Sequence, residues 1–186
     1  MNKKTSSRSS KLTLGISLLV LGLLLLFSKN KSETNPSSTF KSEPIIVEDF
    51  NQEVYDDAKL PKKIIIPSVS IDVEVKKAQI IAGFWEVFSE SAGWGMGSGI
   101  PGEIGNQVIF AHAREGLFLP LQSIKVGSRI YLLTEEKWFT YEVHEIKEVY
   151  PRQTEVIRPT DEETLTLYTC SGFRDSKRLI VLAKRE

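Results

Sequence analysis

The residues best suited to covalent chemistry lie in one stretch near the end of the 186-residue chain, residues 164–183, which reads TLTLYTCSGFRDSKRLIVLA. Two runs rich in apolar and β-branched residues, 165–169 and 179–182, predict strands joined by a short polar connection. Cys170, the only cysteine of the chain, follows the first run, and Arg178 precedes the second. If the runs pair as an antiparallel hairpin, the thiol and the guanidinium lie side by side, because cross-strand partners have neighbouring side chains.

A lone cysteine has two interpretations. Cysteine outside disulfides is among the most buried residue types and behaves as a small hydrophobe, so composition alone favours a core position for Cys170. A thiol is also a nucleophile, but its pKa is about 8.5, so at neutral pH a neighbouring cation is needed to favour the thiolate. One cysteine cannot form an internal disulfide, and Cys170, His112 and His144 are too scattered for a zinc-ligand pattern.

The two histidines are the candidate bases. His112 follows the apolar run 107–111 and precedes a loop, a position where functional residues are common. His144 lies inside the run 138–149, where strand alternation places it on one face among charged neighbours, as for an ordinary surface residue. We therefore predict that His112 is the functional histidine.

The stretch 93–105 holds six glycines and one proline. This composition predicts an irregular connection rather than a helix or a strand. A phosphate-binding loop would need a Gly-Lys-Ser/Thr ending or a following helix, and the sequence has neither. The simpler interpretation is a tight connection that leads into the run 107–111.

The overall composition describes one globular domain without a charge bias. Hydrophobic residues make up 41% of the chain and charged residues 26%, which is ordinary for a single domain. The 24 basic and 24 acidic residues cancel. Without net charge there is no general attraction to nucleic acid, so we expect no nucleic-acid partner.

The amino-terminal part has a membrane pattern. Residues 1–11 form a basic, serine-rich tail, and residues 12–28 carry no charge and are mostly apolar. No small-residue cleavage site follows, so we predict a retained single-pass transmembrane anchor with its basic tail in the cytoplasm. Residues 29–60 then predict an extracytoplasmic linker, and residues 61–186 the folded domain.

From residue 61 onward, short β-rich runs alternate with turn residues. The runs are 63–67, 71–75, 84–88, 107–111, 129–134, 138–149, 165–169 and 179–182. Eight short strands in a domain of this size predict an all-β barrel or sandwich, with a short helical turn over 117–124.

Four segments of this domain form a specific pattern: IPSVSID at 66–72, PGEIGN at 101–106, NQVIFAH at 106–112, and TLYTC at 166–170 with an arginine eight residues on. Together with the anchor and the linker, they resemble the sortase family of cysteine transpeptidases over residues 62–184. The family usually has glycine where Ala111 stands. Because alanine is the smallest side chain that could replace it, we expect an altered loop conformation and an intact site.

The resemblance implies a closed eight-stranded sortase-type β-barrel with His112, Cys170 and Arg178 as its catalytic residues. Thr169 and Ala111 are expected to contact the substrate. The implied reaction cleaves a secreted protein at a Leu-Pro-x-Thr-Gly-like sorting signal, between Thr and Gly, and transfers the carbonyl to an amine of a peptidoglycan precursor or a pilin lysine. It implies a cell-membrane enzyme whose catalytic domain, residues 61–186, lies outside the cytoplasm and needs no metal or organic cofactor.

Other assignments remain open at this point. Arg174 is a rival to Arg178, although a loop arginine beside Asp175 is typically solvated. The same residues could serve a hydrolytic cysteine peptidase that uses water in place of the amine. A non-catalytic, anchored β-domain that binds peptides, with Cys170 buried and inert, is a third possibility. Product analysis separates transfer from hydrolysis, and thiol labelling separates catalysis from binding.

Overall fold

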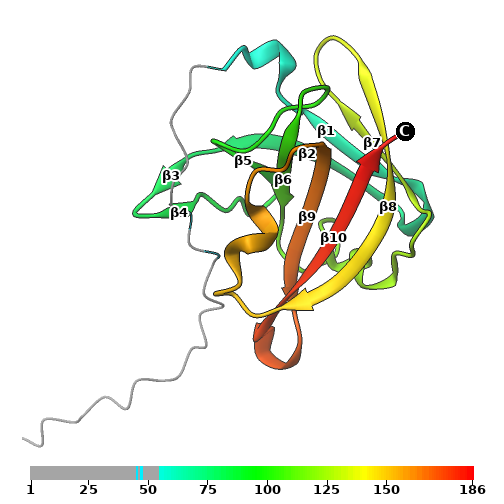
Figure 1. Cartoon of the computed structure of the whole chain (residues 1–186). Helices are drawn as coiled ribbons and strands as arrows, with labels where there is room; N and C mark the ends of the chain where they lie inside the picture. Colours follow the sequence, from blue (N-terminus) through cyan, green and yellow to red (C-terminus); the bar gives the residue numbers. More distant parts are fainter. Residues whose placement is uncertain (1–44, 46, 48–54) are drawn as a thin grey trace, which may run out of the picture. The chain divides into compact units, whose positions relative to one another are not determined.

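The computed structural model describes Ile45, Val47 and residues 55–186 (Figure 1). The strands are β1 (Lys63–Ile66), β2 (Ile71–Ala78), β3 (Ile80–Ile81), β4 (Phe84–Trp85), β5 (Ala92–Gly95), β6 (Gly105–Phe110), β7 (Arg129–Leu133), β8 (Trp138–Val149), β9 (Glu163–Ser171) and β10 (Lys177–Arg185). The 3₁₀ helices are η1 (Asp57–Lys59), η2 (Pro67–Val69), η3 (Leu119–Ser123), η4 (Thr154–Ile157) and η5 (Phe173–Asp175).

Eight of these strands close into a barrel in the order β1-β2-β5-β6-β9-β10-β8-β7, and β7 pairs back to β1. The pairs β2–β5 and β6–β9 are parallel, whereas the other neighbours are antiparallel. Figure 1 shows β9, β10 and β8 side by side on one wall, with the β9–β10 connection projecting beyond it. The prediction of a closed, eight-stranded, all-β barrel is confirmed.

One predicted barrel strand is wrong. The run 84–88 contributes β4 to a separate two-stranded hairpin with β3, and the barrel strand is instead β5, within the glycine-rich stretch that we expected to be irregular. Aromatic rings lie against the backbone of β5, which only glycine permits. A Cβ added at Gly93 would lie 2.9 Å from Cζ of Phe110, and one at Gly95 would overlap the Trp85 ring.

The barrel wall carries two apolar layers. The inner layer fills the barrel and includes Trp94, Leu165 and Leu167. The outer layer covers the outside of β6, β9 and β10 and includes Phe110 and Tyr168. Because alternate residues of a strand point to opposite faces, β9 contributes to both layers and is buried along nearly its whole length, although it alternates threonines with apolar residues.

Separate segments cover the outer layer. Ile45 and Val47 are buried in it, and the backbone N–H of Val47 donates to the carbonyl of Gly83 in the β3–β4 turn at 2.8 Å. The η4 segment is held over the same face by Asn106 of β6, whose Nδ2 donates to the carbonyl of Val156 at 3.1 Å. The outer face of β6 and β9 is therefore a second core rather than a solvated surface.

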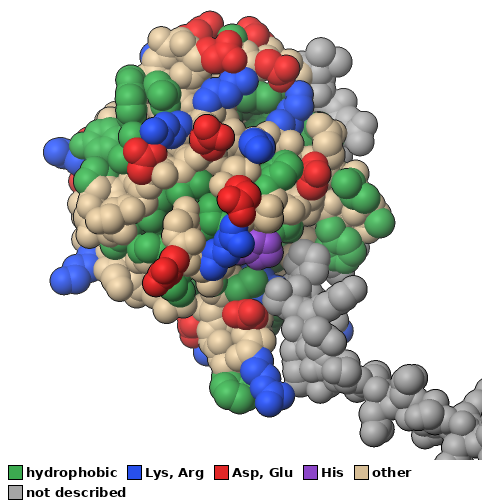
Figure 2. All heavy atoms as spheres, turned by 180° about the vertical axis from the view of Figure 1, so that it is seen from behind, with side chains coloured by type: hydrophobic (Ala, Val, Ile, Leu, Met, Phe, Trp, Pro, Cys, Tyr) green, Lys and Arg blue, Asp and Glu red, His purple; other side chains and the backbone are tan. Residues whose placement is uncertain are grey.

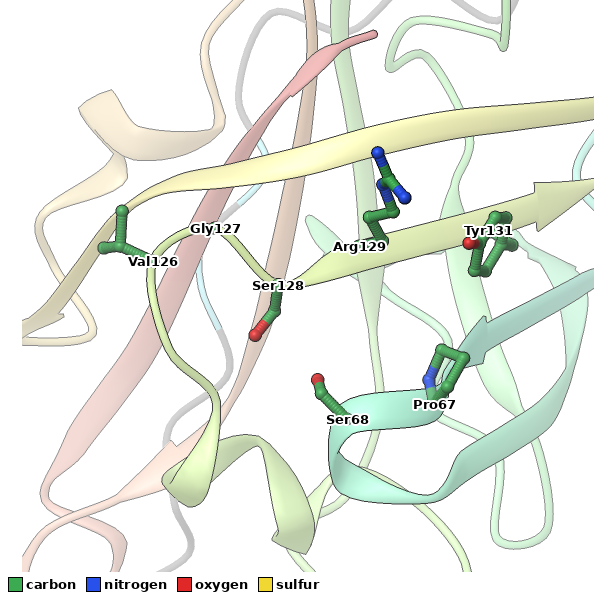
Figure 3. A pocket seen from close by; sticks show the side chains of 7 residues that line it. All are labelled: Pro67, Ser68, Val126, Gly127, Ser128, Arg129 and Tyr131. Carbon is green, nitrogen blue, oxygen red and sulfur yellow. The ribbon is translucent and has the colours of Figure 1, made fainter.

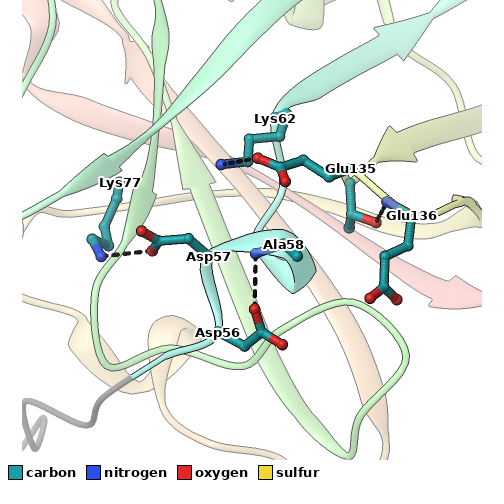
Figure 4. Close-up of polar contacts among 8 residues, drawn as sticks. Asp56, Asp57, Ala58, Lys62, Lys77, Glu135 and Glu136 are labelled. Atoms are coloured by element: carbon teal, nitrogen blue, oxygen red, sulfur yellow. Dashed lines mark hydrogen bonds and ion pairs between the residues drawn. The ribbon is translucent and has the colours of Figure 1, made fainter.

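The short helix η1 ties the chain ahead of β1 to the barrel (Figure 4). Oδ1 of Asp56 accepts a hydrogen bond from the backbone N–H of Ala58 at 3.1 Å and caps the helix. Nζ of Lys77, on β2, lies 2.9 Å from Oδ1 of Asp57. This contact lowers the pKa of the Asp57 carboxyl from its ordinary value.

Residues just ahead of Pro61 belong to the packed unit. Leu60 is buried in the inner layer, and the Tyr55 ring meets the Trp94 ring edge-on at 5.0 Å between centroids. By its contacts this unit spans Ser42–Glu186. The predicted linker 29–60 is therefore too long at its carboxyl end, because apolar side chains before residue 61 complete the cores of the domain.

The predicted basic tail 1–11 and transmembrane anchor 12–28 lie outside the described residues and stay predictions. Within the residues that the structure describes, no helix has the length and apolar character needed to cross a membrane.

Candidate active site

The β9–β10 hairpin places Cys170 beside Arg178. The two residues are direct cross-strand partners in an antiparallel pair, so the predicted hairpin register is confirmed. Cys170 lies on the outer face of the barrel with Tyr168, two residues earlier in β9. It is half-buried, which distinguishes it from the fully buried residues of the inner core.

The parallel pair β6–β9 places His112 on the other side of Cys170. Phe110, the last residue of β6, is the partner of Tyr168, and the backbone N–H of Ala111 donates to the carbonyl of Tyr168 at 3.4 Å. His112 therefore leaves the strand next to the end of β9, and it lines the same pocket as Cys170. The exposed His112 begins a turn in which its carbonyl oxygen accepts the backbone N–H of Phe118 at 3.1 Å. Strand pairing thus places a base and an arginine on either side of the thiol.

Thr169 and Ala111 join β9 to the segment that carries His112. Oγ1 of Thr169 donates to the carbonyl oxygen of Ala111 at 2.8 Å, and both residues are buried. Neither lines the pocket beside Cys170. Their observed contact positions the histidine segment, and their predicted contact with the substrate stays a prediction.

A pocket of about 270 Å³ opens beside the thiol. Its lining residues come from the end of β9, the connection after β6 and η5: Cys170, His112, Ala113, Arg114 and Asp175. The predicted nucleophile and the predicted base therefore share one pocket. Arg114 is held at its edge by Glu90, with 3.0 Å between Nη2 and Oε1.

Arg178 is not among the residues that line this pocket, and only 1% of its surface is exposed. Its Nη1 donates to the carbonyl oxygens of Asp175 at 2.9 Å and Lys177 at 2.8 Å. These two bonds orient the guanidinium plane and hold the hairpin connection. A permanently charged group beside a thiol favours the thiolate and can stabilise a developing oxyanion.

The rival arginine has a different environment. Arg174 is exposed on η5 in a left-handed conformation, with φ of 53°. Its guanidinium carbon lies 5.2 Å from the centroid of the Phe173 ring, which is itself 81% exposed. Arg174 does not line the pocket, and its exposure on the hairpin connection distinguishes it from the buried Arg178.

The second histidine lies apart from this cluster. His144 is exposed on β8, where it is the extra residue of a bulge against β10. Val149, which pairs with Arg178, lies five residues further along β8. At about 3.3 Å per residue, His144 is roughly 16 Å from the end of the strand that adjoins the site. Its interpretation as a surface residue agrees with this position.

An aromatic row on the outer face ends next to Cys170. The Tyr168 ring stacks on Phe110 at 5.0 Å between centroids, and Phe110 stacks on Trp85 at 5.6 Å. Burial raises the pKa of the Tyr168 hydroxyl well above its ordinary value, and the charge of Arg178 opposes this shift. Tyr168 therefore stays neutral at physiological pH, and its ring continues the apolar outer layer up to the thiol.

A larger hollow of about 460 Å³ lies between η2 and the start of β7. Figure 3 shows the Ser68 and Ser128 side chains on its facing sides, with Arg129 and Tyr131 beyond them. Nε of Arg129 is bound to Oε1 of Glu186 at 2.9 Å. No residue predicted to be functional lines this hollow, so its size does not mark it as the active site.

A family model called Sortase domain matches residues 64–186 of the chain. This chain belongs to the sortase family. Sortase A of Streptococcus agalactiae serotype III (strain NEM316) is 34% identical over 131 residues, which cover 66% of this chain and 51% of that protein. Sortase A of Listeria monocytogenes serovar 1/2a (strain ATCC BAA-679 / EGD-e) is 27% identical over 211 residues, covering 95% of this chain and 91% of that protein.

Solved sortase structures have the same fold. The lid mutant of Sortase A from Corynebacterium diphtheriae is 28% identical, with a TM-score of 0.61 over 68% of this chain and 70% of that one. A Sortase D5 transpeptidase from Clostridium perfringens is 26% identical, with a TM-score of 0.61 over 72% of this chain and 82% of that one. The family resemblance seen in the sequence is thus confirmed.

Sequence reasoning did not assign three residues that line the pocket of this sortase, namely Ala113 and the charged residues Arg114 and Asp175. Arg114 follows His112 by two residues, and Asp175 precedes Arg178 by three. Their proximity to these predicted residues was the available signal. It was insufficient because the turn after β6 and the left-handed backbone of η5 decide which side chains reach the thiol.

Proposed function

We propose that this sortase is a membrane-anchored cysteine transpeptidase. Its substrates are secreted proteins with a Leu-Pro-x-Thr-Gly-like sorting signal, which it cleaves between Thr and Gly. It transfers the threonyl carbonyl to an amine of a peptidoglycan precursor or a pilin. The observation that supports this proposal is that Cys170 pairs with Arg178 across the β9–β10 hairpin and shares a pocket with His112.

In the first half of the reaction, the Cys170 thiolate attacks the threonyl carbonyl carbon. Negative charge develops on the carbonyl oxygen, and Arg178 meets it with a guanidinium whose plane is already set by two carbonyl oxygens. Protonated His112 gives its proton to the glycine nitrogen as the C–N bond breaks. The products are a thioester on Cys170 and a free glycine amine.

In the second half, an acceptor amine enters the pocket and attacks the thioester. His112 now accepts a proton from the amine nitrogen, a new amide bond forms, and the C–S bond breaks. Arg178 favours the departing thiolate because its positive charge attracts the negative sulfur. The half-buried position of Cys170 supports both steps, since a fully buried thiol could meet neither substrate.

The proposed location is the outer side of the cell membrane. The apolar segment 12–28 would anchor the chain, and its preceding basic tail would stay in the cytoplasm. Topology is testable by fusing a reporter that is active on only one side of the membrane to the carboxyl end after Glu186. Reporter activity in the cytoplasm would contradict this orientation.

Product analysis tests the transfer reaction. The purified protein is mixed with a Leu-Pro-x-Thr-Gly peptide, with and without an oligoglycine or diamino-acid amine, and the products are weighed by mass spectrometry. We expect a Thr–amide product that grows with amine concentration. A product that carries only water at the threonyl carbonyl, at every amine concentration, would identify a hydrolytic peptidase instead.

A further inference from the structure

Asp175 has an unusual setting at the pocket. It lines the pocket with Cys170 and His112, and its backbone is left-handed, with φ of 59°. Few residue types tolerate this conformation, and aspartate and asparagine are among them. Nη1 of Arg178 holds the Asp175 carbonyl at 2.9 Å, so the arginine of the site holds this residue in place.

The side chain of Asp175 is exposed and has no ion pair or hydrogen bond within the part of the chain that the structure describes. Among the described residues that line the pocket, it supplies the one carboxylate. The other charged side chain of the lining, Arg114, is paired with Glu90. The Asp175 carboxylate therefore lies in the same pocket as the thiol, without an ion-pair partner among the described residues.

We propose that Asp175 binds the ammonium group of the acceptor and so selects cationic primary amines for the second half of the reaction. This inference rests on the proposed function. Amines of the peptidoglycan or lysine type are protonated in neutral solution. A carboxylate at the pocket attracts these cations more strongly than it attracts neutral water, the competing nucleophile. Acidic and basic side chains are interspersed on the face that Figure 2 shows, so that face carries no broad region of one charge.

The bound ammonium becomes the nucleophile by losing one proton to His112. The neutral nitrogen attacks the thioester carbon, the C–S bond breaks, and Cys170 departs as the thiolate while the nitrogen releases its second proton to solvent. His112 keeps the first proton, which restores the state in which the enzyme began the reaction. Asp175 itself exchanges no proton in this sequence; it positions the amine between the base and the thioester.

Asp175→Asn tests this role, because asparagine has nearly the same shape and accepts the left-handed backbone. The acyl-enzyme is formed with a Leu-Pro-x-Thr-Gly peptide, and its aminolysis is followed with two nucleophiles. Triglycine amide is largely cationic at neutral pH, whereas hydroxylamine is uncharged. We expect the KM for triglycine amide to rise about three- to fivefold, the upper part of the range for loss of an exposed ion pair. Acylation and the reaction with hydroxylamine should stay within about twofold of the wild type.

The matched control is Asp161→Asn, which removes the same charge from an exposed residue just ahead of β9, at the end opposite Cys170. It should leave both nucleophiles unaffected. The wild-type preference for triglycine amide should also weaken at high ionic strength, because salt screens an exposed charge. Equal losses with both nucleophiles, or no loss with either, would overturn the role of Asp175. Failure of the wild type to form a thioester would instead refute the proposed function.

Discussion

At the scale of single residues, Arg178 combines a positive charge with a planar set of N–H donors. Substitution can separate these two properties. Arg178→Lys keeps the charge but gathers its N–H donors on one nitrogen, so it loses the planar fork in which Nη1 bonds two carbonyl oxygens while the other nitrogens carry further donors. We expect single-turnover acylation to slow by about a hundred- to a thousandfold, the usual effect of losing one oxyanion donor. Rapid-quench assays of acyl-enzyme formation measure this directly.

Arg174→Ala is the control for that experiment, since Arg174 is exposed and outside the pocket lining. It should acylate at close to the wild-type rate. If Arg178→Lys acylated at nearly the wild-type rate while Arg174→Ala acylated much more slowly, the electrostatic role would belong to Arg174.

The position of Cys170 beside Arg178 could be predicted from the sequence because strand pairing determines it, whereas His112 is predicted from its place at a strand end and from the family resemblance. Two adjoining apolar runs form a hairpin in one register, and a residue at the end of the first then meets one at the start of the second. Asp175 could not be predicted this way. Its place depends on a left-handed backbone and on a hydrogen bond from Arg178, both of which arise only in the folded hairpin.

At the scale of elements, β5 shows where pattern reading fails. Glycines are turn signals in a sequence, but in β5 they let Trp85 and Phe110 pack on the backbone. The Trp85 indole N–H also donates to the carbonyl of Met96 at 2.9 Å. The strand is stabilised by tertiary contacts with β4 and β6, and no local propensity of Gly93 or Gly95 reveals them.

Gly95→Ala should therefore destabilise the fold strongly. The added Cβ would overlap the Trp85 ring, which the indole hydrogen bond holds in place. We expect a loss of about 3 kcal/mol in the free energy of unfolding, at the upper end of overpacking costs. Urea denaturation followed by tryptophan fluorescence measures it.

Gly116→Ala is the matched comparison. A Cβ there meets no atom within 4 Å, although φ is +76°, so only backbone strain of about 1 kcal/mol applies. Equal costs for the two variants would show that packing of Trp85 on β5 is not the cause.

At the scale of the whole molecule, the barrel depends on residues that the sequence places in a linker. Ile45 and Val47 lie in the outer layer, and Leu60 lies in the inner layer. The sequence did not predict this because 29–60 is rich in polar and charged residues, and its few apolar side chains form no periodic pattern. These side chains are buried because they pack on the apolar layers of the barrel, which are formed by distant parts of the sequence.

Truncations at two positions test this dependence. A chain that starts at Ser42 keeps these apolar contacts, whereas one that starts at Pro61 loses them. Burial of one such side chain contributes roughly 1.5 to 3 kcal/mol, so the shorter chain should be less stable by at least about 3 kcal/mol. Thermal unfolding of both soluble domains gives the comparison. Indistinguishable melting temperatures of the two chains would show that the stable domain begins at residue 61, as the sequence predicts.

The thioester on Cys170 connects all three scales, because it requires the thiol, the strand register and an accessible pocket together. Intact-mass spectrometry of the chain with a Leu-Pro-x-Thr-Gly peptide should reveal a new species heavier by the acyl fragment that ends in threonine. Cys170→Ala should fold normally, since losing one half-buried sulfur removes little volume, and it should show neither the adduct nor peptide cleavage. Undiminished cleavage between Thr and Gly by a folded Cys170→Ala protein would contradict the assignment of Cys170 as the nucleophile.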